Sequence, residues 1–108
     1  MIEKFKIDIP DDKISKIIEK VKNYPWTSIS DLPNWEHGTN LSYLKEICNY
    51  WIKNFDWKIQ ENKINFFHNF KTKVDKVDIH FIKEVGSGLN PKTLLLMHGW
   101  PGSVFEFI

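Results

Sequence analysis

The sequence has one cysteine and no long apolar segment, and both shortages exclude classes of protein. Cys48 is the only cysteine among 108 residues, so an internal disulfide framework is excluded. No run approaches the roughly 20 apolar residues of a membrane span, and the first residues lack the apolar region of a signal peptide. We therefore expect a cytoplasmic protein. Cys48 lies on an apolar helical stripe, which favours a buried inert thiol over a nucleophile.

An excess of one charge is also lacking. The 15 basic and 14 acidic residues give a net charge of +1, which offers no basis for binding nucleic acid or an anionic membrane. Hydrophobic residues make up 42% of the chain, which is enough for the core of one small domain.

Several kinds of chemical site are missing as well. The histidines have no metal-ligand spacing with one another or with Cys48, so no metal site and no cofactor is expected. They are His37, His68, His80 and His98. Ser103 follows Gly102, but Phe105 stands where a serine nucleophile elbow requires a second glycine.

Three stretches have apolar residues three and four positions apart, a spacing typical of amphipathic helices. Each stretch begins at a residue whose side chain can cap a helix. The predicted helices are 12–22 after Asp11, 41–51 after Thr39 or Asn40, and 57–67 after Asp56. The irregular stretch 24–39 contains Trp26 and Trp35, which must anchor it, either on this domain or on a further one.

Short stretches of alternating apolar and polar residues predict strands. They are residues 5–9, 70–74 and 77–81. The last two are expected to pair as a hairpin, although its turn, Asp75-Lys76, lacks the glycine usual at the second position.

The last eighteen residues predict one unit of an α/β sheet. The apolar run 92–97 favours a strand buried on both faces. The glycines and proline of 99–102 make a sharp turn at the strand's carboxyl end, where such sheets build active sites. Ser103 and Glu106 fit a capping box, so a helix should begin there.

The turn itself carries the one hint of chemistry. Its backbone N–H groups could stabilise an oxyanion, although a plain strand-to-helix turn remains the alternative. Proline makes a cis peptide accessible, and we expect the Trp100-Pro101 peptide to be cis. Residues 104–108 include four apolar residues and no C-cap glycine, so we expect the chain to be the front of a longer protein.

The segment His98-Gly99-Trp100-Pro101-Gly102-Ser103, followed by Glu106-Phe107, resembles the oxyanion-hole segment of epoxide hydrolases of the α/β-hydrolase superfamily. Tyr50-Trp51, Phe55-Asp56-Trp57 and Ile79-His80-Phe81 extend the resemblance to the N-terminal region of the microsomal and juvenile-hormone type. Lys76, where that family often has glycine, and Pro25, where a basic residue is common, are small departures that concern local turns.

The resemblance implies an α/β fold that is incomplete within this chain. Residues 1–68 would form the N-terminal helical meander. Residues 69–108 would begin the α/β-hydrolase core, with a hairpin, a buried strand, the oxyanion turn and the start of a helix. The chain would pack on the missing hydrolase core and lid.

The implied reaction is hydrolysis of a small-molecule epoxide to a vicinal diol through an ester intermediate. The backbone N–H of Trp100 would be the oxyanion donor, supported by His98, Gly99 and Pro101. The aspartate nucleophile, its acidic partner, the histidine and the lid tyrosines would lie beyond residue 108. Two alternatives stay open: a truncated interaction fragment without catalysis, and the front of another α/β hydrolase, such as a dehalogenase or an esterase.

Overall fold

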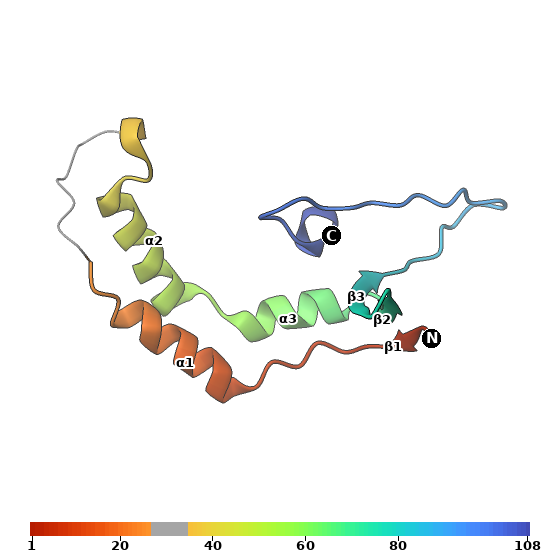
Figure 1. The fold of residues 1–108 in the computed structure, drawn as a ribbon, viewed down its shortest axis with the longest axis horizontal. Helices are drawn as coiled ribbons and strands as arrows, with labels where there is room; N and C mark the ends of the chain where they lie inside the picture. Colours follow the sequence, from red (N-terminus) through yellow and green to blue (C-terminus); the bar gives the residue numbers. More distant parts are fainter. Residues whose placement is uncertain (27–34) are drawn as a thin grey trace. The chain divides into compact units, whose positions relative to one another are not determined.

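The computed structural model describes residues 1–26 and 35–108, with three helices and a small antiparallel sheet (Figure 1). The chain divides into two compact units. The first unit is Ile9–Trp57, and the second is Met1–Asp8 together with Lys58–Ile108. Each is described by itself. No helix in the described ranges is long and apolar enough to cross a membrane. The boundary at residue 68 between a meander and a hydrolase core stays a prediction.

Two helices, α1 (Asp11–Lys22) and α2 (Leu41–Asn54), lie side by side in the first unit (Figure 1). Both match the helices that the apolar spacing predicts. Their stripes face a shared groove of about 450 Å³, to which Val21 and Leu44 contribute. Cys48 also lines this groove and is half-buried, less enclosed than the sequence predicts.

The two helix starts differ from each other. The Asn40 side chain caps α2, because its Oδ1 accepts a hydrogen bond from the Tyr43 N–H at 3.0 Å. The predicted cap of α1 is wrong. Pro10 precedes this helix, its carbonyl accepts from the backbone of Lys13 and Ile14, and no side chain caps the end. Asp11 is the first helical residue instead, where its charge still favours the helix dipole.

The two tryptophans of the irregular stretch pack on tyrosines of their own unit. Trp26 meets Tyr24 edge to face at 4.9 Å, and Trp35 is tilted against Tyr43 at 5.1 Å between ring centroids. Trp35 is still 58% exposed. The rest of that stretch, residues 27–34, lies outside the described residues.

The second unit contains a three-stranded antiparallel sheet in the order β1-β2-β3. Its strands are β1 (Glu3–Lys4), β2 (Asn69–Val74) and β3 (Val77–Ile82). Phe70 pairs with Phe81 in the β2–β3 register, and their rings stack at 5.6 Å. The predicted hairpin is therefore confirmed.

Asp75 and Lys76 form the two-residue turn of this hairpin, with φ angles of 48° and 70°. Positive φ at both central residues is the geometry of a type I′ turn, whose twist matches that of the flanking strands. The turn forms although Lys76 takes the place of the usual glycine.

The strand predicted at residues 5–9 is wrong, since β1 ends at Lys4. The Phe5 N–H still donates to the Asn69 carbonyl at 2.9 Å. At Ile7, however, the backbone partner is a side chain, the amide of Asn65. Alternation along the sequence does not distinguish a strand partner from a side-chain partner.

Helix α3 (Trp57–Asn65) precedes the hairpin and matches the third predicted helix. Ile64 is 3% exposed and is the one buried apolar residue among those described. The Asn69 side chain links the helix end to β2, because its Nδ2 donates to the carbonyls of Ile64 and Phe67 at 2.8 Å each.

The predicted buried strand at residues 92–97 is not formed. The segment has no regular structure, and Leu94 and Met97 are 77% and 80% exposed. A strand requires a neighbour for its backbone groups, and the described residues place none beside it. The helix expected after Ser103 is a short 3-10 turn, η2 (Val104–Phe107).

Candidate functional site

The segment Gly99–Gly102 forms a closed turn at the end of the apolar run. The Trp100–Pro101 peptide is cis, as expected, and the Gly102 N–H donates to the Gly99 carbonyl at 2.7 Å. A proline in cis at the third position is the arrangement of a type VI turn. The backbone of the four residues is therefore held by its own hydrogen bond.

The Trp100 N–H stays available in this turn. Within residues 1–26 and 35–108, no hydrogen bond joins it to another group. The Trp100 side chain is 97% exposed, so nothing described encloses the indole. The Trp100 N–H is thus a free backbone donor in a turn that the Gly102–Gly99 hydrogen bond closes.

His98 lies beside this donor. Its Nδ1 is 3.4 Å from the Gly99 carbonyl oxygen, which can only accept, so any contact requires a proton on Nδ1. The same oxygen accepts the hydrogen bond that closes the turn. The structure therefore brings together all four residues that the sequence singles out.

The predicted capping box is half formed. Ser103 Oγ accepts from the Phe105 N–H at 3.3 Å, so the serine does cap η2. The Glu106 side chain, however, does not return to the Ser103 N–H, and only its backbone bonds to Ser103, at 3.1 Å.

The Glu106 carboxylate instead occupies the space beside Gly102. A Cβ at Gly102 would collide with Glu106 Oε1 and would lie 2.6 Å from Glu106 Cδ. It would also lie 2.9 Å from the Gly99 carbonyl oxygen. The S-x-x-E pattern does single out Glu106 in the sequence, but it predicts a contact with the Ser103 N–H, which does not form.

A hollow of about 650 Å³ adjoins the turn within the second unit. It lies between β3 and the apolar run, and its lining includes His80, Leu96, His98 and Phe107. The hollow is largely apolar, and it reaches the start of the turn because His98 lines it.

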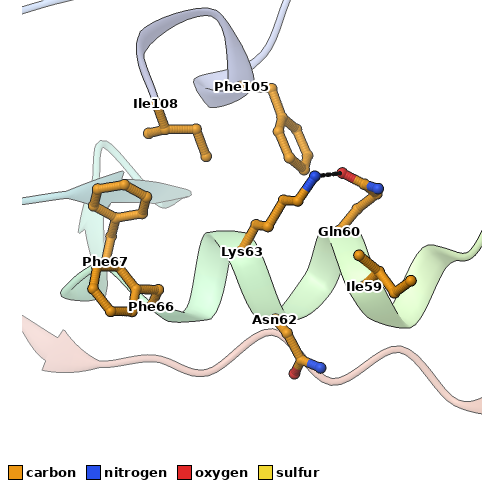
Figure 2. A pocket seen from close by; sticks show the side chains of 8 residues that line it. All are labelled: Ile59, Gln60, Asn62, Lys63, Phe66, Phe67, Phe105 and Ile108. Atoms are coloured by element: carbon orange, nitrogen blue, oxygen red, sulfur yellow. Dashed lines mark hydrogen bonds between the residues drawn. The ribbon is translucent and has the colours of Figure 1, made fainter.

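A second hollow, of about 610 Å³, lies between α3 and η2 (Figure 2). Phe105 of η2 and Ile108, which follows η2, face it from one side, and Phe67 faces it from the segment between α3 and β2. Its polar contact is the bond from Lys63 Nζ to Gln60 Oε1 at 3.3 Å. Its lining has no carboxylate, cysteine, serine or histidine, and Lys63 is its one charged residue.

Two other histidines, His80 and His68, contact polar side chains of neighbouring segments. His80 Nε2 donates to Asn69 Oδ1 at 2.8 Å, since the Asn69 Nδ2 is already bonded to carbonyls. His68 Nδ1 lies 2.9 Å from Glu84 Oε2. The side chain of His37 lies outside the described residues. In the described ranges, no cluster of three potential metal ligands occurs.

The surroundings of these histidines lower the pKa of His80 and of Glu84, for different reasons. Burial, and then the positive charge of Lys71, lower the pKa of His80 below its usual 6.5. The hydrogen bond from the His68 backbone, and then that from its ring, lower the pKa of Glu84. Neither His80 nor Glu84 belongs to the turn of Gly99–Gly102.

Comparison with protein families matches residues 2–107 to the family described as epoxide hydrolase N terminus. Epoxide hydrolase 1 of Oryctolagus cuniculus is 40% identical over 110 residues, which cover 98% of this chain and 24% of that protein. Juvenile hormone epoxide hydrolase of Manduca sexta is 36% identical, with the same two shares covered. The chain thus spans about a quarter of the length of these relatives.

Solved structures agree. The epoxide hydrolase of Aspergillus niger superposes with a TM-score of 0.87 at 26% identity, covering 99% of this chain and 29% of that one. Juvenile hormone epoxide hydrolase of Bombyx mori gives a TM-score of 0.84 at 29% identity, covering 99% and 26%. The predicted fold class, the N-terminal region of an α/β-hydrolase-type epoxide hydrolase, is confirmed.

Proposed function

Since this chain belongs to the epoxide hydrolase family through its N-terminal region, we propose that it is the front part of an enzyme that hydrolyses epoxides to vicinal diols. Its own contribution is the oxyanion turn, His98 to Pro101. The observation that carries the proposal is the Trp100 N–H, which has no hydrogen-bond partner in the described ranges and lies in a turn closed by the Gly102–Gly99 hydrogen bond.

The reaction has two steps, and the turn acts in the second. A carboxylate from the rest of the enzyme attacks an epoxide carbon, the C–O bond breaks, and the ring oxygen takes a proton to become a hydroxyl. Activated water then attacks the carbonyl carbon of the resulting ester. Negative charge develops on the carbonyl oxygen, which faces the Trp100 N–H. The bond between the carbonyl carbon and the diol oxygen then breaks, and this oxygen leaves as the second hydroxyl with the proton of the new carboxyl group. The carboxylate is thereby regenerated, and the proton removed from water replaces the one used in the first step.

A single backbone donor can change the rate of ester hydrolysis substantially. Loss of one oxyanion donor lowers catalytic rates by about 10²–10³-fold in enzymes that form tetrahedral intermediates. The donor works because it is already oriented, so little reorganisation accompanies the reaction. The closed turn supplies this orientation, and His98 lies beside the carbonyl of the same turn.

The exposed apolar run supports the second part of the proposal, that this chain packs on a hydrolase core. Leu95 and Met97 are 76% and 80% exposed, and burial of apolar area contributes about 25 cal/mol per Å². A strand of the core placed in the hollow beside β3 would cover these side chains and pair with the backbone of the run. The small-molecule epoxide would then bind at the carboxyl end of that strand.

Single-turnover hydrolysis of styrene oxide in ¹⁸O-labelled water tests the proposed reaction in the complete protein that carries these residues. An ester intermediate places a carboxylate oxygen in the first diol formed, so this diol should contain no label. Label in the first turnover would show direct attack of water on the epoxide. Turnover of haloalkanes or carboxylic esters in preference to epoxides would favour a dehalogenase or an esterase.

A further inference from the structure

We propose that the segment Met1–Phe5 is a pH-sensitive strap, which leaves the sheet when the His80 imidazole takes up a proton. The strap includes β1 and lies along the outer edge of β2. None of the groups involved belongs to the oxyanion turn, so release of the strap does not depend on the proposed reaction. His80, which the turn does not use, acquires a role in this way.

Few contacts hold the strap. Two residue pairs join its backbone to β2, and the Phe5 N–H donates to the Asn69 carbonyl at 2.9 Å. The Thr72 hydroxyl donates to the Met1 carbonyl at 3.3 Å. Phe5 is the one half-buried residue of the strap, since Met1 to Lys4 are exposed. Attachment therefore depends on what the Phe5 side chain contacts.

Two side chains of the sheet contact the Phe5 ring. The Lys71 ammonium of β2 lies over its face, with Nζ 3.7 Å from the ring centroid. The His80 imidazole of β3 meets it edge to face, with the ring centroids 5.5 Å apart. Lys71 and His80 also lie directly opposite each other in the β2–β3 register. The Phe5 ring thus shields the imidazole from water and holds a positive charge close to it.

A proton taken up by His80 enters at Nδ1. The other ring nitrogen, Nε2, already donates to Asn69 Oδ1 at 2.8 Å, and the imidazolium keeps this hydrogen bond. Protonation therefore leaves the contact with Asn69 in place. What changes is the charge of the ring, beside Phe5 and opposite Lys71.

Release of the strap relieves both effects that oppose this charge. Burial, and then the positive charge of Lys71, lower the pKa of His80 below its usual 6.5. When Phe5 leaves, water reaches the imidazole, and the ammonium is no longer held over the ring. The released state therefore binds the proton at higher pH than the attached state. Attachment is complete above about pH 6.5 and is lost as the pH falls through the pKa of the attached state.

Charged groups on the neighbouring elements are engaged with other partners. On the same strand as His80, Asp78 forms an ion pair with Lys73 of β2 at 2.6 Å. On α3, the Glu61 carboxylate is bonded to Lys58 at 3.0 Å. Neither carboxylate is a cause of the lowered pKa of His80.

Three further titratable groups lie toward the hollow or the strap. Glu84 lines the same hollow as the imidazole, and its carboxylate lies 2.9 Å from His68. His98 lines that hollow as well. Glu3 is opposite Lys71 in the β1–β2 register, and no salt bridge joins this pair of described residues. Lys71 is thus the charge that acts on the imidazole.

Hydrogen exchange in the complete protein tests the release, with the Ile7 amide as an internal reference. The Asn65 side chain holds Ile7, so Ile7 should stay protected when the strap leaves. Between about pH 7.5 and about pH 5, the protection factor of the Phe5 amide should fall about two- to fivefold more than that of Ile7, the ratio that one exposed cation–π contact provides. Equal falls at both amides would indicate opening of the whole unit and would overturn the proposal.

Three variants assign the effect to its groups. His80→Gln keeps an N–H donor for Asn69 but does not titrate, so the extra fall at Phe5 should disappear. Lys71→Met should reduce it, because one of its two causes is removed. Lys83→Met, an exposed change beside β3, is the matched control and should leave it unchanged. An extra fall that persists in full in His80→Gln or in Lys71→Met would overturn the proposal.

A second measurement needs no variant. In an NMR pH titration of the complete protein, the nuclear Overhauser contact between the Phe5 and His80 rings should weaken with the midpoint at which His80 titrates. One proton drives both changes, so the two midpoints should agree. A ring contact of unchanged intensity throughout the titration of His80 would overturn the proposal.

Discussion

The side-chain amide of Asn65 forms two hydrogen bonds with the backbone of Ile7. Its Nδ2 donates to the Ile7 carbonyl at 2.7 Å, and its Oδ1 accepts from the Ile7 N–H at 2.9 Å. The amide thereby replaces the strand neighbour that Ile7 would otherwise need. One side chain at the end of α3 joins residues 58 positions apart in the sequence.

Asn65→Ala should therefore loosen the start of the chain. Both backbone groups of Ile7 lose their partner, and an unsatisfied group of this kind costs about 1–3 kcal/mol where water is excluded. Hydrogen exchange at the Ile7 amide, measured in the complete protein, should become faster. Asn62→Ala, an exposed change on the same helix, is the control. Unchanged exchange in Asn65→Ala would contradict this account.

Lys76→Gly should stabilise the hairpin. The Lys76 φ of 70° lies in the left-handed region, which costs roughly 1–2 kcal/mol for residues with a Cβ. The greater freedom of glycine in the unfolded chain offsets part of this, so we expect a gain of about 0.5–1 kcal/mol in the free energy of unfolding. Denaturant unfolding of the complete protein measures it. Val77→Gly, in the adjoining strand, should destabilise instead, and a loss in both variants would contradict the assigned turn.

The stability of the second unit should decrease in mild acid because of His80. Its folded pKa is lowered by burial and then by Lys71, so the unfolded chain takes up the proton at higher pH than the folded one. The contribution is therefore complete above about pH 6.5 and is lost as pH falls through the folded pKa. Lys71→Met should raise the His80 pKa, as followed by the ring proton signals in NMR, and Lys53→Met should not.

The polypeptide 1–108 alone should not form diol from styrene oxide. It contains no nucleophile elbow, and the side chains of its apolar run are exposed. For the same reason it should bind a dye such as ANS and melt without a sharp transition. Turnover that a point mutation within this polypeptide abolishes would contradict the first expectation. A cooperative transition of the monomer would contradict the second.

Local patterns in the sequence predict the elements that depend on neighbours in the sequence. The stripes of α1 and α2, the Asn40 cap and the β2–β3 hairpin all follow from spacing and cap chemistry. These contacts form within a few residues, so the sequence contains the information. The closed backbone of the turn from Gly99 to Gly102 likewise follows from its glycines and proline, while its role as an oxyanion turn stays a prediction.

Contacts between distant residues are the part that the sequence does not predict. The Asn65 amide replaces a strand at Ile7, and no local pattern distinguishes it from any other asparagine. The apolar run 92–97 needs neighbouring strands before it can form one itself, and the described residues supply none.

The measurement that tests the central claim most directly is the rate of ester hydrolysis in the complete enzyme carrying Pro101→Ala. Proline restricts φ to about −65°, and alanine releases the backbone that aims the Trp100 N–H. We predict that ester hydrolysis slows by about tenfold or more while ester formation changes little. Trp100→Ala, which keeps the N–H, should slow hydrolysis less and mainly weaken substrate binding. An unchanged rate of ester hydrolysis in Pro101→Ala would contradict the oxyanion role of this turn.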